Sequence, residues 1–133
     1  MTTTIEQRAK VYLLDQFSHP IYSFADKETG DEGFDLWLVE KGGTRKKVEL
    51  KATEGEFTRP SSLFERLVFN AEIEKTLFES GESVIARVFL GRSPYRVFVI
   101  TNAIFGDGAG LKTEARYVVR GKINYNKSYS ELA

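Results

Sequence analysis

The sequence predicts an α/β fold in which two helices pack against a mixed β-sheet. The first observation is that two segments carry apolar residues at helical spacing, each behind a helix-start signal. The second is that five shorter segments are rich in β-branched and aromatic residues and are separated by turn residues. The order is helix, three strands, helix, two strands, with helices expected at residues 3–17 and 60–80 and strands at 21–24, 34–39, 47–52, 83–90 and 95–101.

The composition is that of an ordinary globular domain. The chain of 133 residues is 41% hydrophobic and fits a single domain, residues 1–133. Its 19 basic residues balance its 19 acidic residues, so any contact with nucleic acid must be local. With no cysteine and one histidine, disulfides, thiolate chemistry and sites built mainly from imidazoles are excluded, and a metal would be held by oxygen. The chain has neither a membrane-length apolar run nor a signal-peptide pattern, which predicts a cytoplasmic protein with no membrane contact.

Local signals bound both predicted helices. Thr4 and Gln7 fit a capping box, and Pro20 follows the last apolar position of the first helix. Pro60 and the two serines after it begin the second helix, and Gly81 stops it. The second helix has a wide apolar surface, which suits packing against a sheet.

Two strands around a glycine turn form the expected hairpin. Residues 34–39 are apolar at both alternating positions, which is typical of a strand covered on both faces, whereas residues 47–52 alternate apolar and charged side chains. Residues 102–133 form an irregular or β-rich C-terminal extension, with a loop at 105–111, one or two strands within 115–125 and a fraying tail at 127–133.

Three ionisable residues of this hairpin are the candidate site. A carboxylate in an apolar strand, such as Asp35, needs a charged partner, strong hydrogen bonds, a metal or an exposed strand end. Glu49 and Lys51 lie two residues apart, so they share one face of the second strand. Two converging carboxylates suit Mg²⁺ or Mn²⁺, and a lysine beside that metal could orient a water molecule or offset phosphate charge. The alternative is a solvated strand face with a weak salt bridge.

Taken with the element order, these residues resemble the PD-(D/E)xK nuclease superfamily. In that superfamily an αβββαβ core presents Asp and Glu-x-Lys from its second and third strands, binds divalent metal and hydrolyses phosphodiester bonds. Here the two parts read Gly-Phe-Asp, ending at Asp35, and Val-Glu-Leu-Lys, ending at Lys51. They look most like the Holliday-junction-resolvase-like branch, although Phe34 stands where the motif has proline.

The resemblance covers residues 6–101 and implies both a fold and a set of roles. The fold would be a restriction-endonuclease-like αβββαβ core at about residues 3–101, a mixed sheet flanked by helices. Asp35, Glu49 and Lys51 would be catalytic, and Asp35 and Glu49 would bind Mg²⁺ or Mn²⁺. Glu6 would be a further metal ligand, because the branch places a glutamate on its first helix. From the residues alone, a glutamate at this position is more often just a first-turn residue favoured by the helix dipole.

The length of the hairpin loop decides whether this site can form. A two-residue turn at Gly42 and Gly43 would set Asp35 opposite Leu50, on the wrong face for Glu49. A three-residue loop that includes Lys41, or a single bulge, would set Asp35 directly opposite Glu49. The site hypothesis therefore requires an odd loop or a bulge.

The leading hypothesis is a metal-dependent endonuclease-like domain that acts on DNA. Because the charge is balanced and the chain small, the protein is expected to form a homodimer or to work beside a DNA-binding partner protein. The first alternative is a nuclease-fold module without catalysis that binds protein or nucleic acid. The second is an unrelated α/β protein whose motif is accidental, which a different strand order would reveal.

Overall fold

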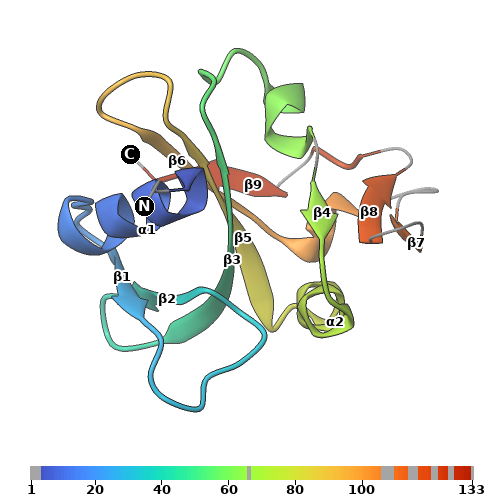
Figure 1. Ribbon diagram of the computed structural model, residues 1–133, viewed down its shortest axis with the longest axis horizontal. Helices are drawn as coiled ribbons and strands as arrows, with labels where there is room; N and C mark the ends of the chain where they lie inside the picture. Colours follow the sequence, from blue (N-terminus) through green and yellow to red (C-terminus); the bar gives the residue numbers. More distant parts are fainter. Residues whose placement is uncertain are drawn as a thin grey trace.

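The computed structural model describes residues 4–65, 67–105, 110–113, 117–120, 123–125 and 128–132 (Figure 1). Within these residues it has two α-helices, two short 3-10 helices and nine strands. In chain order they are α1 (Ile5–Asp15), β1 (Tyr22–Asp26), β2 (Leu36–Glu40), β3 (Arg45–Thr53), η1 (Pro60–Phe64), β4 (Val68–Phe69), α2 (Glu72–Ser80), β5 (Ser83–Phe89), β6 (Arg96–Ile100), η2 (Asn102–Ile104), β7 (Gly110–Thr113), β8 (Tyr117–Arg120) and β9 (Tyr129–Glu131).

A six-stranded mixed sheet forms the centre of the molecule, in the order β1-β2-β3-β5-β6-β9. The strands β1, β2 and β3 are antiparallel neighbours, β3 is parallel to β5, and β5, β6 and β9 are again antiparallel. The connection from β3 to β5 contains α2, as a parallel pair requires. The predicted α/β fold with a mixed sheet is therefore confirmed.

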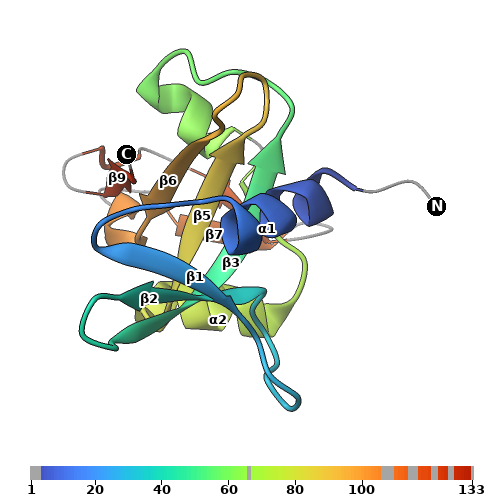
Figure 2. The ribbon, with the colours of Figure 1, turned by 90° about the vertical axis from the view of Figure 1, so that its left-hand side faces the viewer.

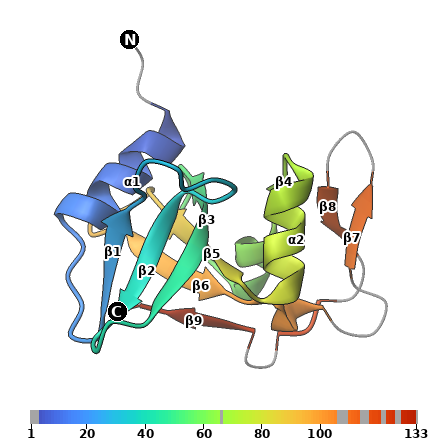
Figure 3. The same cartoon turned by 90° about the horizontal axis from the view of Figure 1, so that it is seen from below.

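Helix α1 packs on one face of this sheet, which curls around it (Figures 2 and 3). The predicted capping box is present, because the Thr4 side chain accepts from the Gln7 backbone and the Gln7 side chain accepts from the Thr4 backbone. Ala9 and Leu13 are the buried residues of the helix. They join a core cluster with the inward side chains of the sheet, among them Leu36, Val48, Leu50, Val84, Ala86 and Val97.

The second face of the sheet carries the other core cluster. This cluster takes side chains from η1, β4 and α2 and packs them on β5 and β6. A small second sheet of order β4-β8-β7 lies beyond α2, at the right of Figure 1. The α2 side of the sheet is also the side to which Glu49 and Lys51 belong, because neighbouring β3 residues Val48 and Leu50 point into the α1 core.

The prediction of one continuous helix at 60–80 is wrong, because the middle of this segment is not helical. The chain forms η1, then an extended segment, and α-helix only from Glu72. Leu67 and Phe69 are buried on either side of half-buried Val68, which is the period of a strand. The Val119 backbone donates to the Leu67 carbonyl, and Phe69 pairs with β8. Pairing with a strand from the C-terminal extension thus overrides the local helical pattern.

The prediction that residues 127–133 fray is also wrong for the residues of this segment that the structure describes. Tyr129–Glu131 forms β9 on the edge of the main sheet, and Leu132 is buried in the α1 core. Arg96 of β6 holds both carboxylate oxygens of Glu131 at 2.7 and 2.9 Å. Residues 3, 66, 106–109, 115–116, 121–122, 127 and 133 of the predicted elements lie outside the described residues.

No helix in the described part of the chain has both the length and the apolar character needed to cross a membrane.

Candidate functional site

The loop between β2 and β3 has three residues, Lys41, Gly42 and Gly43. The Glu40 backbone N–H donates to the Thr44 carbonyl at 2.8 Å, so these two residues close the hairpin. The Gly43 N–H donates to the Glu40 carbonyl at 2.9 Å. Both glycines have positive φ angles, 112° and 99°, which a residue with a side chain rarely adopts. Two adjacent glycines therefore make the odd loop possible.

This loop length sets the strand register that the site hypothesis required. The pairing of β2 with β3 begins at Leu36 opposite Val48, and the same register extended by one residue sets Asp35 next to Glu49. The Asp35 backbone N–H donates to the Val48 carbonyl at 2.8 Å, and its Oδ2 accepts from the Leu50 N–H at 2.7 Å. The Asp35 carboxylate thus takes the place of a main-chain carbonyl as the acceptor for the Leu50 N–H, and the pairing of β2 with β3 ends there. Asp35 is thus fixed against β3 at the start of β2.

Asp35 and Glu49 line one cavity of about 290 Å³, and Glu74 joins them from the first turn of α2. Its lining residues come from the segment before β2, from β3 and from the start of α2, and Figure 3 shows β2, β3 and α2. Its remaining lining residues are mostly apolar: Gly33, Phe34, Ala71 and Ile73. Three carboxyl groups therefore share one small hollow.

Glu49 is the most perturbed carboxyl group of this cavity. It is 6% exposed, and burial raises its pKa to about 9, with the hydrogen bond to Glu74 and the charge of Asp35 adding to the rise. The Lys51 ammonium lies 3.4 Å from Oε1 and opposes the rise without cancelling it. At neutral pH Glu49 therefore holds a proton, and its contact with Lys51 is weaker than a full ion pair. A bound cation would take the place of that proton.

A buried arginine extends this charged face along the sheet. Arg87 of β5 pairs in register with Lys51 of β3, so both side chains leave the same face. Arg87 is 6% exposed, and its Nη2 donates to the Glu65 carbonyl at 3.0 Å. Burial lowers the pKa of Arg87, while the charges of Glu65 and Glu6 raise it. Sequence reasoning missed Arg87, although a charge inside the apolar strand 83–90 is the same signal that singled out Asp35.

Glu6 is exposed on the first turn of α1 and is not among the residues that line the cavity. Its charge acts on Arg87 rather than on Glu49. The structure therefore brings Asp35, Glu49 and Lys51 together and leaves Glu6 outside the cavity. Its role as a metal ligand stays a prediction.

The donor set of the cavity fits a hard divalent cation. Carboxylate oxygens are the ligands that Mg²⁺ prefers, and Mg²⁺ commonly keeps several waters while using one or two carboxylates. Asp35 and Glu49 supply that number. Among the described residues, no three acidic, histidine or cysteine side chains are grouped closely enough to hold a metal by themselves. A cation here would therefore keep part of its water shell.

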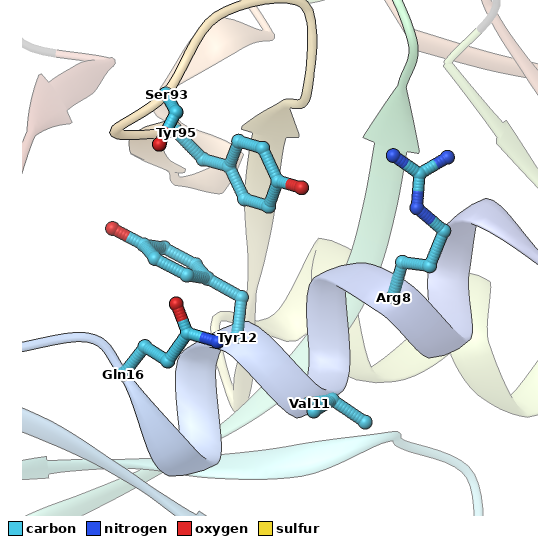
Figure 4. Close-up of a pocket in the computed structure, with 6 residues that line it drawn as sticks. All are labelled: Arg8, Val11, Tyr12, Gln16, Ser93 and Tyr95. Carbon is cyan, nitrogen blue, oxygen red and sulfur yellow. The ribbon is translucent and has the colours of Figure 1, made fainter.

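A second cavity, of about 390 Å³, has a different character. It lies between α1 and the turn after β5, and its lining residues are Arg8, Val11, Tyr12, Gln16, Ser93 and Tyr95 (Figure 4). The rings of the two tyrosines meet edge to face at 4.8 Å, and burial followed by the charge of Tyr95 raises the pKa of Tyr12. No carboxyl group is among these lining residues, so the cavity offers no hard-cation site.

Comparison with known proteins gives no match to any family model, any curated protein or any solved structure.

Proposed function

We propose that this protein hydrolyses phosphodiester bonds in DNA with the help of Mg²⁺ or Mn²⁺. The observation that carries the proposal is that Asp35 and Glu49 line the same cavity, with the Lys51 ammonium 3.4 Å from Glu49. A one-residue change of register would have separated these groups. The element order supports the proposal, because β3 is parallel to β5 across α2, as an αβββαβ core requires.

Asp35, Glu49 and Lys51 divide two proposed roles between them. Asp35 and Glu49 hold the cation, and Glu74 polarises Glu49 through their hydrogen bond. Bound metal would supply Lewis-acid activation of water and phosphate. Lys51 orients the attacking water and offsets negative charge on the phosphate, because its ammonium lies 3.4 Å from the Glu49 carboxyl group.

The β2–β3 hairpin provides a local surface for DNA. Arg45 stacks over the Trp37 ring at 4.3 Å, and Lys47 lies 5.6 Å from the Phe34 ring centre. Trp37 and Lys47 are directly opposite each other, and Phe34 also lines the carboxyl cavity. Basic and aromatic side chains together suit a phosphate backbone and its bases. Because this surface is small, we expect a second copy of the chain or a DNA-binding partner protein to contribute to DNA binding.

A nuclease-fold module without catalysis is the second candidate, and one observation favours it. Asp35 already accepts from the Leu50 N–H, and a protonated Glu49 already contacts both Glu74 and Lys51. These contacts satisfy part of the site without a metal. The module would bind nucleic acid or protein through the same hairpin and would leave DNA intact.

Cleavage of plasmid, single-stranded and branched DNA in Mg²⁺ or Mn²⁺ separates the two candidates. Asp35→Asn and Lys51→Ala should each lower the rate by about a hundredfold or more, because each removes a group that acts in the transition state. Matched controls are Asp15→Asn and Lys10→Ala, both on α1, which should cleave as wild type does. Cleavage that survives both site substitutions would contradict the proposal, and an absence of both cleavage and metal binding would favour the module.

A further inference from the structure

Arg87 is buried without the anionic partner that such a residue normally requires. Among the described residues its Nη2 has one hydrogen bond, to the Glu65 carbonyl, and its Nε has no partner. Arginine stays charged in proteins, so it cannot relieve burial by losing its proton. A buried charge with incomplete hydrogen bonding is costly, and its retention calls for an explanation.

Lys51 places a second cation directly beside it. The two residues pair in register on neighbouring parallel strands and leave the same face of the sheet. The Lys51 side chain is 14% exposed and has Glu49 as its ion-pair neighbour at 3.4 Å. Among the described residues, Glu49 is therefore the one carboxyl group in ion-pair contact with these two cations.

The surrounding acidic groups do not supply the missing anionic partner of Arg87. Glu65 offers its main-chain carbonyl to Arg87, while the carboxyl groups of Glu65 and Glu6 act on it only through their charge. Both glutamates are exposed, where water weakens their pull. An oxyanion that accepts from Arg87 Nε and from the Lys51 ammonium would satisfy both donors at once.

We propose that Lys51 and Arg87 form an oxyanion subsite that binds a phosphate group. Arg87 offers its unpartnered Nε–H, and Lys51 offers its ammonium on a side chain that is 14% exposed. Phosphate oxygens are acceptors only, which matches a pair that has only donors. Lys51 belongs both to this subsite and to the proposed catalytic site. The assignment of the phosphate to a nucleic acid backbone therefore rests on the proposed function.

The direct test follows the Arg87 Nε–H signal by nuclear magnetic resonance in the wild-type protein. Inorganic phosphate is titrated at constant ionic strength in a buffer with a metal chelator, so neither cleavage nor bound metal contributes. The signal is assigned by its loss in Arg87→Lys. The expected result is a saturable shift in the millimolar range. The internal control is Arg92, whose Nε is 2.8 Å from Glu56 and whose side chain is 81% exposed, and its signal should stay in place.

Variants give the second measurement. Lys51→Gln should weaken phosphate binding about tenfold, which corresponds to about 1.4 kcal/mol. Arg92→Gln should leave binding unchanged. An Arg87 signal that does not move with phosphate, or equal weakening in Arg92→Gln, would overturn the subsite.

A short single-stranded oligonucleotide, titrated in the same way, identifies the source of the phosphate. A shift with the oligonucleotide supports binding of a nucleic acid backbone. A shift with inorganic phosphate alone supports the subsite and contradicts its use for nucleic acid. If DNA is cleaved but phosphate causes no shift, the proposed function stands and the subsite falls.

Discussion

Replacing Glu49 with glutamine should make the protein more stable at neutral pH. In the wild type, burial and two neighbouring carboxyl groups raise the pKa of Glu49 to about 9 from an ordinary value of 4.5. Between these values the folded protein holds a proton that the unfolded chain has released. The contribution of Glu49 to stability is therefore greatest below pH 4.5 and falls as the pH rises toward 9. Glutamine has the shape of the protonated acid and can still donate to Glu74, but it has no proton to lose.

The size of the effect follows from the same shift. Neutral pH lies about 2.5 pH units above the ordinary pKa, and each unit corresponds to about 1.4 kcal/mol. Glu49→Gln should therefore raise the free energy of unfolding by about 3 kcal/mol at pH 7 and by almost nothing near pH 4.5. A gain of this kind is expected where a functional group has been placed at the expense of stability.

Urea denaturation between about pH 5 and pH 8 measures this difference. The matched control is Glu82→Gln, whose side chain is 62% exposed and whose nearest cation, Lys47, is 3.9 Å away. It should change stability by less than about 0.5 kcal/mol. The reasoning is refuted if Glu49→Gln is no more stable than the wild type at pH 7, or if its advantage does not grow with pH.

Two further predictions concern the same hairpin and cavity. Glu74→Gln should lower the pKa of Glu49, because it removes a neighbouring negative charge and adds an amide N–H that can donate to the ionised carboxylate. Titration of Glu49 by carbon-13 magnetic resonance would detect this, and an unchanged midpoint would count against the three-carboxyl cavity. Gly43→Ala should cost about 1 kcal/mol or more, since its φ of 99° is strained for alanine while nothing lies within 4 Å of the added methyl group. Thermal unfolding would measure that cost, and a variant as stable as the wild type would mean that the three-residue loop relaxes.

Sequence reasoning was strongest where local pattern and chemistry agreed. Thr4 and Gln7 formed the expected capping box, and the alternation of residues 47–52 assigned Val48 and Leu50 to the core. The two loop lengths considered at Gly43 predicted opposite faces for Asp35, and the structure has the three-residue loop. Periodicity and turn chemistry are local properties, so a single sequence can carry them.

Sequence reasoning failed where distant segments meet. Leu67 and Phe69 are drawn into a strand by β8, more than forty residues away in the chain, and the C-terminal Leu132 is anchored by packing in the α1 core. Glu74 reaches the carboxyl cavity because α2 begins at residue 72, a boundary set by the same rearrangement. Arg87 could have been found, because a cation inside an apolar strand requires the same explanation as Asp35.

The central claim is that Asp35 and Glu49 share one divalent cation, and Mn²⁺ titration by calorimetry at pH 7 tests it most directly. The wild type should bind Mn²⁺ and release about one proton for each ion bound, because Glu49 must give up its proton. Asp35→Asn and Glu49→Gln should each abolish this binding, while Glu82→Gln keeps it. Binding that survives both site substitutions, or a wild type that binds no Mn²⁺, would contradict the claim.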